Sequence, residues 1–144
     1  MTVVRREDGH EIDTSAGRLD LALVHRWLAT DAYWAIDRPV ETVTTSVANS
    51  LCFGVYAPDG AQVGFARGVT DRATFAWLCD VYIDRAARGR GLGTWLAQTA
   101  TTRLLSDGVR RVLLATADAH GVYAQAGFQP LRDPARWMEI SPTR

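Results

Sequence analysis

Two helical patterns occupy the first third of the chain. Across residues 21–28, apolar side chains recur every three or four positions, the spacing that places them on one face of a helix. The same spacing runs across residues 40–47, directly after Pro39, and proline is well tolerated in the first turn of a helix. A short strand-like run at residues 11–13 precedes both. These patterns predict a first strand followed by two amphipathic helices.

The apolar pattern changes in the middle of the chain. Residues 51–56 and 63–69 are strand-like and are separated by a turn at residues 58–60, which predicts a hairpin. A long apolar run at residues 75–83 follows a second turn. We therefore predict three consecutive strands before the chain returns to a helical pattern.

The last third of the chain mixes both patterns. The elements expected there are a helix through Leu96, Ala100 and Leu104 that ends with Gly108 as its cap, a strand at 112–115, a short helix at 119–126 and a last strand at 136–140. No repeat, low-complexity tract or linker interrupts the pattern, so residues 1–144 are expected to form one domain. The order β-α-α-β-β-β-α-β-α-β predicts an α+β fold, or mixed α/β on looser usage, with helices flanking a mostly antiparallel sheet.

Composition narrows the class of protein. The 16 basic and 16 acidic residues give a formal net charge of zero, so no overall field attracts nucleic acid or an acidic membrane. The polar N-terminal residues show no signal sequence, and no apolar run is long enough to span a bilayer, so a cytoplasmic protein is expected. Cys52 and Cys79 lie in apolar runs without metal-ligand spacing, so we expect reduced core cysteines and no metal.

The most informative segment is a glycine-rich loop at residues 88–93, Arg-Gly-Arg-Gly-Leu-Gly, between a strand-like run and a helical pattern. A loop of this kind directs free backbone N–H groups and the positive end of the helix dipole at one point, which favours a phosphate. The spacing is neither G-x-G-x-x-G nor a P-loop, because Thr94 occupies the third glycine position and no Lys follows the loop.

The pattern Arg-x-x-Gly-x-Gly closely resembles the pyrophosphate loop of the GNAT superfamily of N-acetyltransferases, which bind acetyl-coenzyme A. A second segment, Thr116-x-x-Ala119-x-x-x-Tyr123-x-x-x-Gly127-Phe128, is similar to another signature of that family, in which Asn usually stands where Thr116 is. The resemblance covers the chain from about Leu21 to the C-terminus. It implies the GNAT fold, acetyl-coenzyme A as cosubstrate, and acetyl transfer to a primary amine by direct attack through a tetrahedral intermediate, with no acyl-enzyme.

The resemblance also assigns roles to individual residues. The main-chain amides of the loop would bind the pyrophosphate, and the backbone of the preceding strand would pair with the pantetheine arm. The residues implied in coenzyme binding are Val81, Tyr82, Ile83, Arg88, Gly89, Arg90, Gly91, Leu92, Gly93, Thr94 and Thr116. Tyr123 matches the tyrosine that donates a proton to the departing thiolate; its alternative role is packing between helix and sheet.

An amine acceptor must lose a proton before it attacks. An alkyl ammonium is neutral only about 0.04% of the time at pH 7, a penalty of about 4.6 kcal/mol, so a general base or a water relay is expected. His120 lies three positions before Tyr123 and could share its helix face, although a capping or surface role is the alternative. Asp80 is the other candidate, either as the base or as a residue that binds the substrate ammonium or satisfies the strand edge.

The acceptor pocket is less well defined by the sequence. Candidate aromatic walls are Tyr33, Trp34, Trp77 and Trp137, and candidate partners of a substrate carboxylate are Arg38, Arg67 and Arg136.

Neutral charge favours a small-molecule amine over a histone-like tail, and acetylation of a protein or peptide amine is an alternative. A non-catalytic acyl-coenzyme A binding module is another. A nucleic-acid-binding domain is disfavoured by the balanced charge. A homodimer is expected by resemblance only.

Overall fold

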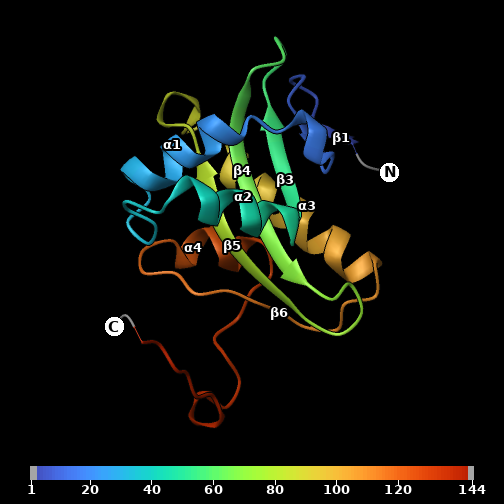
Figure 1. The fold of residues 1–144 in the computed structure, drawn as a ribbon. Coiled ribbons are helices and arrows are strands. Elements are labelled where there is room, and N and C mark those ends of the chain that lie inside the picture. The colour runs from blue at the N-terminus through green and yellow to red at the C-terminus, as the bar shows by residue number, and fades with distance from the viewer. Residues whose placement is uncertain (1–2, 143–144) are drawn as a thin grey trace.

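The computed structural model describes residues 3–142, so Met1 and Thr2 of the polar N-terminal stretch lie outside the described part. In this part, a six-stranded sheet has the order β1-β2-β3-β4-β5-β6 (Figure 1). The strands are β1 (Val3–Arg5), β2 (Glu11–Asp13), β3 (Leu51–Tyr56), β4 (Gln62–Thr70), β5 (Ala76–Ile83) and β6 (Val112–Leu113). All neighbours are antiparallel except β5 and β6, which are parallel. The predicted α+β fold with a mostly antiparallel sheet is confirmed.

Helices cover both faces of this sheet. Those of the described residues are α1 (Leu21–Asp31), α2 (Val40–Ala48), α3 (Leu92–Ser106) and α4 (His120–Gln125), with single 3₁₀ turns η1 (Ala16–Arg18), η2 (Arg85–Ala87) and η3 (Pro134–Arg136). Helices α1 and α2 lie on one face and α3 on the other (Figure 1). Within residues 3–142, no helix combines the length and apolar character needed to cross a membrane.

Helices α1, α2 and α3 form because each buries one face. On α3, buried residues recur at four-residue spacing from Leu92 through Leu96 and Ala100 to Leu104, and they pack against the sheet. On the opposite face, α1 and α2 supply Val24, Trp27, Leu28, Val43 and Val47, which pack against Cys52, Phe65 and Tyr82. The central strands are therefore covered on both faces, and all six residues of β3 are buried.

The end of α3 confirms the predicted glycine cap. Gly108 has a φ of +106°, a left-handed conformation that glycine adopts without the penalty of a Cβ atom. The N–H groups of Gly108 and Val109 donate back to Leu105 and Leu104. The chain then turns into β6, which completes a β5–α3–β6 crossover.

Three expectations about the strands need correction. Strand β1 was not expected, and the strand expected at 112–115 is reduced to Val112–Leu113. The last strand, expected at 136–140, does not form. Asp133 instead has a φ of +54°, and η3 closes a tight turn in which Trp137 N–H donates to the Pro134 carbonyl.

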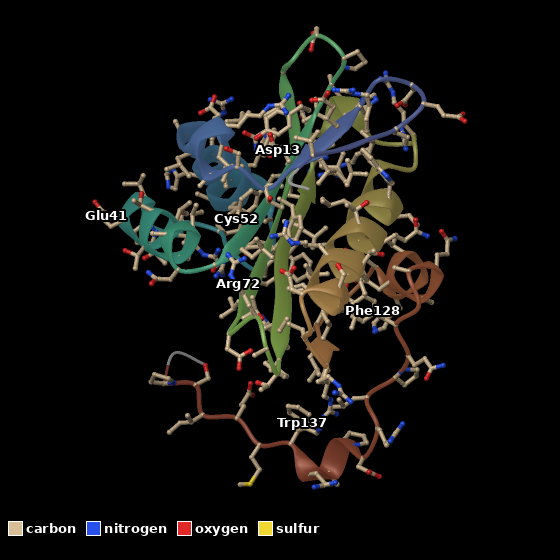
Figure 2. The ribbon with its side chains drawn as sticks, turned by 90° about the vertical axis from the view of Figure 1, so that its right-hand side faces the viewer. Asp13, Glu41, Cys52, Arg72, Phe128 and Trp137 are labelled. Carbon is tan, nitrogen blue, oxygen red and sulfur yellow. The ribbon has the colours of Figure 1, made fainter. Side chains whose placement is uncertain are left out.

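The segment after η3 runs away from the body of the molecule. Figure 2 shows Trp137 on this segment, and its ring lies 4.7 Å from the guanidinium of Arg111, the residue before β6. Met138 and Ile140 are each 96% exposed. Residues 137–140 are mostly apolar, as in a strand, but a strand needs a partner for its backbone N–H and C=O groups, and β6 is too short to provide one.

Candidate active site

The glycine loop brings the end of β5 to the beginning of α3. Gly89 and Gly91 have φ values of +83° and +74°, and Gly91 is the residue that caps α3. Within residues 3–142, the backbone N–H groups of residues 89–94 meet no hydrogen-bond acceptor; the first helical bond runs from Trp95 to Gly91. Six consecutive donors are therefore free at the positive end of a 15-residue helix. This arrangement can bind a phosphate or diphosphate.

The two arginines of the loop behave differently. Arg88 folds back, because its Nε donates to the Ile83 carbonyl at 2.8 Å and its guanidinium lies 5.1 Å from the centre of the Tyr82 ring. Arg90 is exposed, and its side chain forms no hydrogen bond or ion pair with the described residues. Arg90 is thus the loop side chain that is free to meet an anion.

The loop is held from outside by Arg6, a residue that the sequence analysis missed. Arg6 Nη1 donates to the Arg90 carbonyl at 3.0 Å, while its Nη2 pairs with Asp8 and its guanidinium lies over the Trp95 ring. The C=O and N–H groups of a trans peptide point in opposite directions. By fixing the Arg90 carbonyl, Arg6 therefore fixes the direction of the Gly91 N–H.

This contact predicts a measurable effect on coenzyme binding. Arg6→Ala should weaken coenzyme A binding about five-fold, equivalent to about 1 kcal/mol, because the loop loses the hydrogen bond that orients its amide. Arg5→Ala is the matched control, since Arg5 is the neighbouring arginine and its side chain pairs with Glu11 of β2. Calorimetric titration of both variants provides the measurement, and equal affinities would contradict a role for Arg6.

A gap opens in the sheet beside the glycine loop. Among residues 3–142, strand β6 pairs with β5 only at Ala76 and Trp77, so residues 78–83 have β4 on one side and no described strand on the other. This open edge includes Val81, Tyr82 and Ile83. The Tyr82 side chain is buried against Trp27, and its hydroxyl donates to Asp31 at 2.6 Å. Its backbone faces Phe65 of β4, so Val81 and Ile83 present their backbone groups at the edge. An extended chain could pair with this edge as an added strand.

Helix α4 places Tyr123 in a cleft of about 1300 Å³ that Thr116, His120 and Phe128 also line. The Tyr123 ring packs edge-on against Phe128, with 6.0 Å between ring centres. Burial, with smaller contributions from Tyr33 and Asp118, raises the pKa of Tyr123 to about 12. Its hydroxyl forms no hydrogen bond with the described residues, so it is available in the cleft.

The other two residues expected in this cleft have distinct surroundings. His120 is the first residue of α4 and is exposed, and its ring forms no hydrogen bond with the described part of the chain. As the three-residue spacing predicts, it lines the same cleft as Tyr123. The Thr116 hydroxyl accepts a hydrogen bond from the Ala119 N–H at 3.0 Å, which organises the turn before α4.

The loop between α1 and α2 contacts the turn before α4. The Tyr33 hydroxyl accepts a hydrogen bond from the Ala117 N–H at 2.9 Å, which joins this loop to the turn before α4. Trp34 packs edge-on against Tyr33, and its Nε1 donates to Asp80 Oδ1 at 2.9 Å. Trp77 is exposed on β5, whereas Trp137 lies on the C-terminal segment beneath the Arg111 guanidinium.

Asp80 sits at a bulge in β5. Phe65 pairs with Tyr82 but Arg67 pairs with Cys79, so β5 has one residue more than β4 between these pairs, and Asp80 has a φ of +52°. Its carboxylate is 4% exposed and accepts hydrogen bonds from Trp34, from Arg38 Nη1 at 2.8 Å and from Arg67 Nε at 2.9 Å. Burial alone would raise its pKa, but Trp34 and the two guanidinium groups together hold the pKa below its ordinary value.

Three comparisons relate this chain to known proteins. The model of the acetyltransferase (GNAT) family matches residues 21–128. A Gibberella zeae protein, named as an acetyltransferase without a stated substrate, is 30% identical over 126 residues, covering 74% of this chain and 71% of that protein. The crystal structure of a Xanthomonas campestris pv. campestris protein of the same family is 42% identical, with a TM-score of 0.85 over 92% of both chains. A Mycobacterium tuberculosis protein in complex with CoA is 18% identical, with a TM-score of 0.69 over 84% of this chain and 72% of that chain; this is a likeness of fold alone.

Proposed function

This chain belongs to the acetyltransferase (GNAT) family, and from that premise we propose that, as a single domain, it acetylates a primary amine of a small molecule with acetyl-coenzyme A. Members of this family are acyltransferases that use acetyl-coenzyme A. In the proposed reaction, the amine nitrogen bonds to the acetyl carbon, the carbon–sulfur bond breaks, and a proton from the amine balances the charge on sulfur. The observation that carries the proposal is the row of six free N–H groups at the beginning of α3.

The shape of the glycine loop supports a diphosphate ligand. A Cβ atom added at Gly93 would meet only Ile83, at 3.9 Å, and one added at Gly89 would meet nothing within 4 Å. Packing within the protein therefore does not require glycine at either position. Space beside the backbone allows a ligand to approach the N–H groups closely, and Arg90 adds positive charge beside them.

The open edge of β5 supports binding of the pantetheine arm next to that loop. No strand of the described part of the chain pairs with residues 78–83 on this side, so Val81 and Ile83 are the positions we assign to pairing with the arm. Arg88 already occupies the Ile83 carbonyl, which leaves Val81 as the main carbonyl acceptor. A backbone N–H at this edge would polarise the thioester carbonyl.

Tyr123 is the residue we assign as proton donor to the leaving sulfur. With a pKa of about 12, its phenol stays protonated at neutral pH. Transfer to a thiolate whose thiol titrates near 8.5 is uphill by about 5 kcal/mol if that thiolate is fully solvated. Burial of the thiolate beside Tyr123 reduces this difference, because the loss of water raises the pKa of the thiol as well.

His120 is better placed than Asp80 to accept the amine proton. The ring nitrogens of His120 are free of hydrogen bonds to the described residues and lie in the cleft that holds Tyr123. Asp80 already accepts from Trp34, Arg38 and Arg67, and its lowered pKa makes it a weaker base than an ordinary carboxylate. We therefore assign His120, directly or through water, as the base, and Asp80 as a positioning residue.

A paired measurement tests this proposal. Coenzyme A binding is titrated by calorimetry, and a panel of primary amines is incubated with acetyl-coenzyme A while released thiol is recorded. We expect binding at or below millimolar concentrations and thiol release above the hydrolysis background for some amines. Binding without amine-dependent release would favour a non-catalytic acyl-coenzyme A module, and absence of binding would overturn the proposal.

A further inference from the structure

Two guanidinium groups share one buried carboxylate on the α1–α2 face of the sheet. Arg38, from the loop before α2, and Arg67, from β4, both donate to Asp80 Oδ2. The cluster of Arg38, Arg67 and Asp80 therefore has a net charge of +1. Its arginine side chains are 20% and 14% exposed, so they are only partly covered by protein.

These guanidinium groups retain unused donors. Within residues 3–142, Arg67 donates from Nε to Asp80 and from Nη1 to the Ser50 hydroxyl at 3.0 Å, and Arg38 donates from Nη1 alone. Each guanidinium has more N–H groups than these bonds use. The described residues include three buried polar side-chain atoms without a partner, and none of them belongs to Arg38 or Arg67. The unused nitrogens of these two arginines are therefore accessible from the surface. A ligand can accept from them.

The surroundings of the cluster form a recognisable surface. Tyr33, Trp34 and Trp77 are exposed aromatic side chains on the loop and strand that carry the cluster. On another side, Arg67 and Ser50 line a groove of about 460 Å³ between α2 and β4. Asp80 itself belongs to the stretch of β5 whose edge is open, and Tyr33 connects this region to the turn before α4. The cluster thus adjoins the proposed reaction site.

The charge of the cluster decides which end of an amine substrate it favours. Asp80 already accepts three hydrogen bonds and is outnumbered by two guanidinium groups, so a substrate ammonium gains little there. Two other carboxylates lie nearby, Glu41 in the wall of the groove and Asp37 next to Arg38 in the chain, but both are exposed to solvent. The partly buried cluster of Arg38, Arg67 and Asp80 therefore keeps its net positive charge. A carboxylate would accept charge-assisted hydrogen bonds from both arginines, and Asp80 keeps the two groups in place.

We propose that the acceptor is an amino acid-like molecule whose carboxylate binds Arg38 and Arg67 while its amine faces the thioester. This inference rests on the proposed acetyltransferase function, since it concerns the acceptor of that reaction. It adds a chemical class, an amine and a carboxylate in one small molecule, to the general amine proposed above.

The test compares matched acceptors. Free amino acids, their carboxamides and their decarboxylated amines are assayed with acetyl-coenzyme A by thiol release. We expect kcat/KM for the best free acid to exceed that of its carboxamide about ten-fold or more, since charge-assisted hydrogen bonds are lost. Equal values for acid and amide would overturn the carboxylate inference and leave the acetyltransferase proposal intact. Failure of every amine in the panel would overturn both.

A substitution of Arg67 tests whether the substrate carboxylate binds at this cluster. Arg67→Gln should raise KM for the free acid about ten-fold with a much smaller change in kcat, and should leave KM for the carboxamide nearly unchanged. Arg26→Gln, on the exposed face of α1, is the matched control. Coenzyme A titration and thermal unfolding show whether Arg67→Gln remains folded. If it is unfolded, Arg67→Lys replaces it, and KM should again rise for the acid alone. An unchanged KM for the acid in a folded variant contradicts the proposed site.

Discussion

The Gly91→Val variant is expected to lose coenzyme A binding, with affinity reduced about 100-fold or more, equivalent to about 3 kcal/mol. Gly91 has a φ of +74°, and a β-branched residue in that conformation is strained by about 1–2 kcal/mol or more. The loop would relieve this strain by rotating its backbone, and the row of N–H groups would no longer point at one place. A Cβ atom at Gly91 would also lie 3.8 Å from Arg6 Nη1, the group that holds the Arg90 carbonyl. Calorimetric titration with coenzyme A measures the loss.

The control for backbone strain lies at the other end of the same helix. Gly108 also has a positive φ, +106°, and a Cβ atom added there would meet nothing within 4 Å. Gly108→Val should therefore lower the thermal stability to a similar extent while coenzyme A affinity stays the same. Retention of binding in Gly91→Val, or an equal loss in both variants, would contradict the proposed role of the loop.

Tyr123→Phe is expected to lower kcat about 100-fold or more, the usual size of a general-acid contribution, with coenzyme A binding preserved. The Tyr123 hydroxyl forms no hydrogen bond with residues 3–142, and the ring that packs against Phe128 is retained in the variant. Removal of the hydroxyl should therefore leave the fold unchanged, and any loss of rate reports on proton transfer. Steady-state thiol release measures it.

The raised pKa of Tyr123 predicts how the rate of acetyl transfer depends on pH. Because its pKa is raised to about 12, the phenol remains protonated through the neutral and moderately alkaline range. The rate should therefore rise with pH as the acceptor ammonium, near pKa 10.4, loses its proton, without a fall caused by Tyr123 below about pH 10. A decrease above pH 8 that disappears in Tyr123→Phe would contradict this assignment.

Tyr56→Phe is the matched control for the loss of a phenol. Burial raises the pKa of Tyr56 to about 12 as well, but its hydroxyl is buried without a hydrogen-bond partner among the described residues. Its removal should leave kcat unchanged and should not destabilise the protein. A large fall in kcat for this variant would mean that loss of any buried phenol disturbs the site. The fall in kcat of Tyr123→Phe would then not be evidence of proton transfer.

The parts of the site that could be predicted from the sequence are those encoded by neighbouring residues. The glycine loop needs left-handed backbone at Gly89 and Gly91 followed by a helix, and both requirements are visible in a few adjacent positions. The four-residue repeat from Leu92 to Leu104 likewise predicts the buried face of α3. His120 and Tyr123 share a cleft because three residues make almost one helical turn.

The parts that could not be predicted depend on contacts between distant residues. Arg6 meets the Arg90 carbonyl across 84 positions, and no local pattern marks either residue as a partner. The sequence indicated Arg38 and Arg67 as possible carboxylate partners, but not that Asp80 holds both, because this depends on a bulge that turns Asp80 toward them. The strand expected at 136–140 failed for a related reason, since a short apolar run carries no information about whether a neighbouring strand exists.

The hairpin of β1 and β2 sets a lower limit on how far this protein can be shortened. The family match begins at residue 21, so a fragment trimmed to that boundary would lack both strands and Arg6. Strand β3 would become the outer strand, with the backbone groups that now pair with β2 exposed along an apolar segment that invites pairing with other chains. The Arg90 peptide would lose its anchor as well. A minimal fragment chosen by family boundaries alone would therefore sacrifice both solubility and the order of the loop.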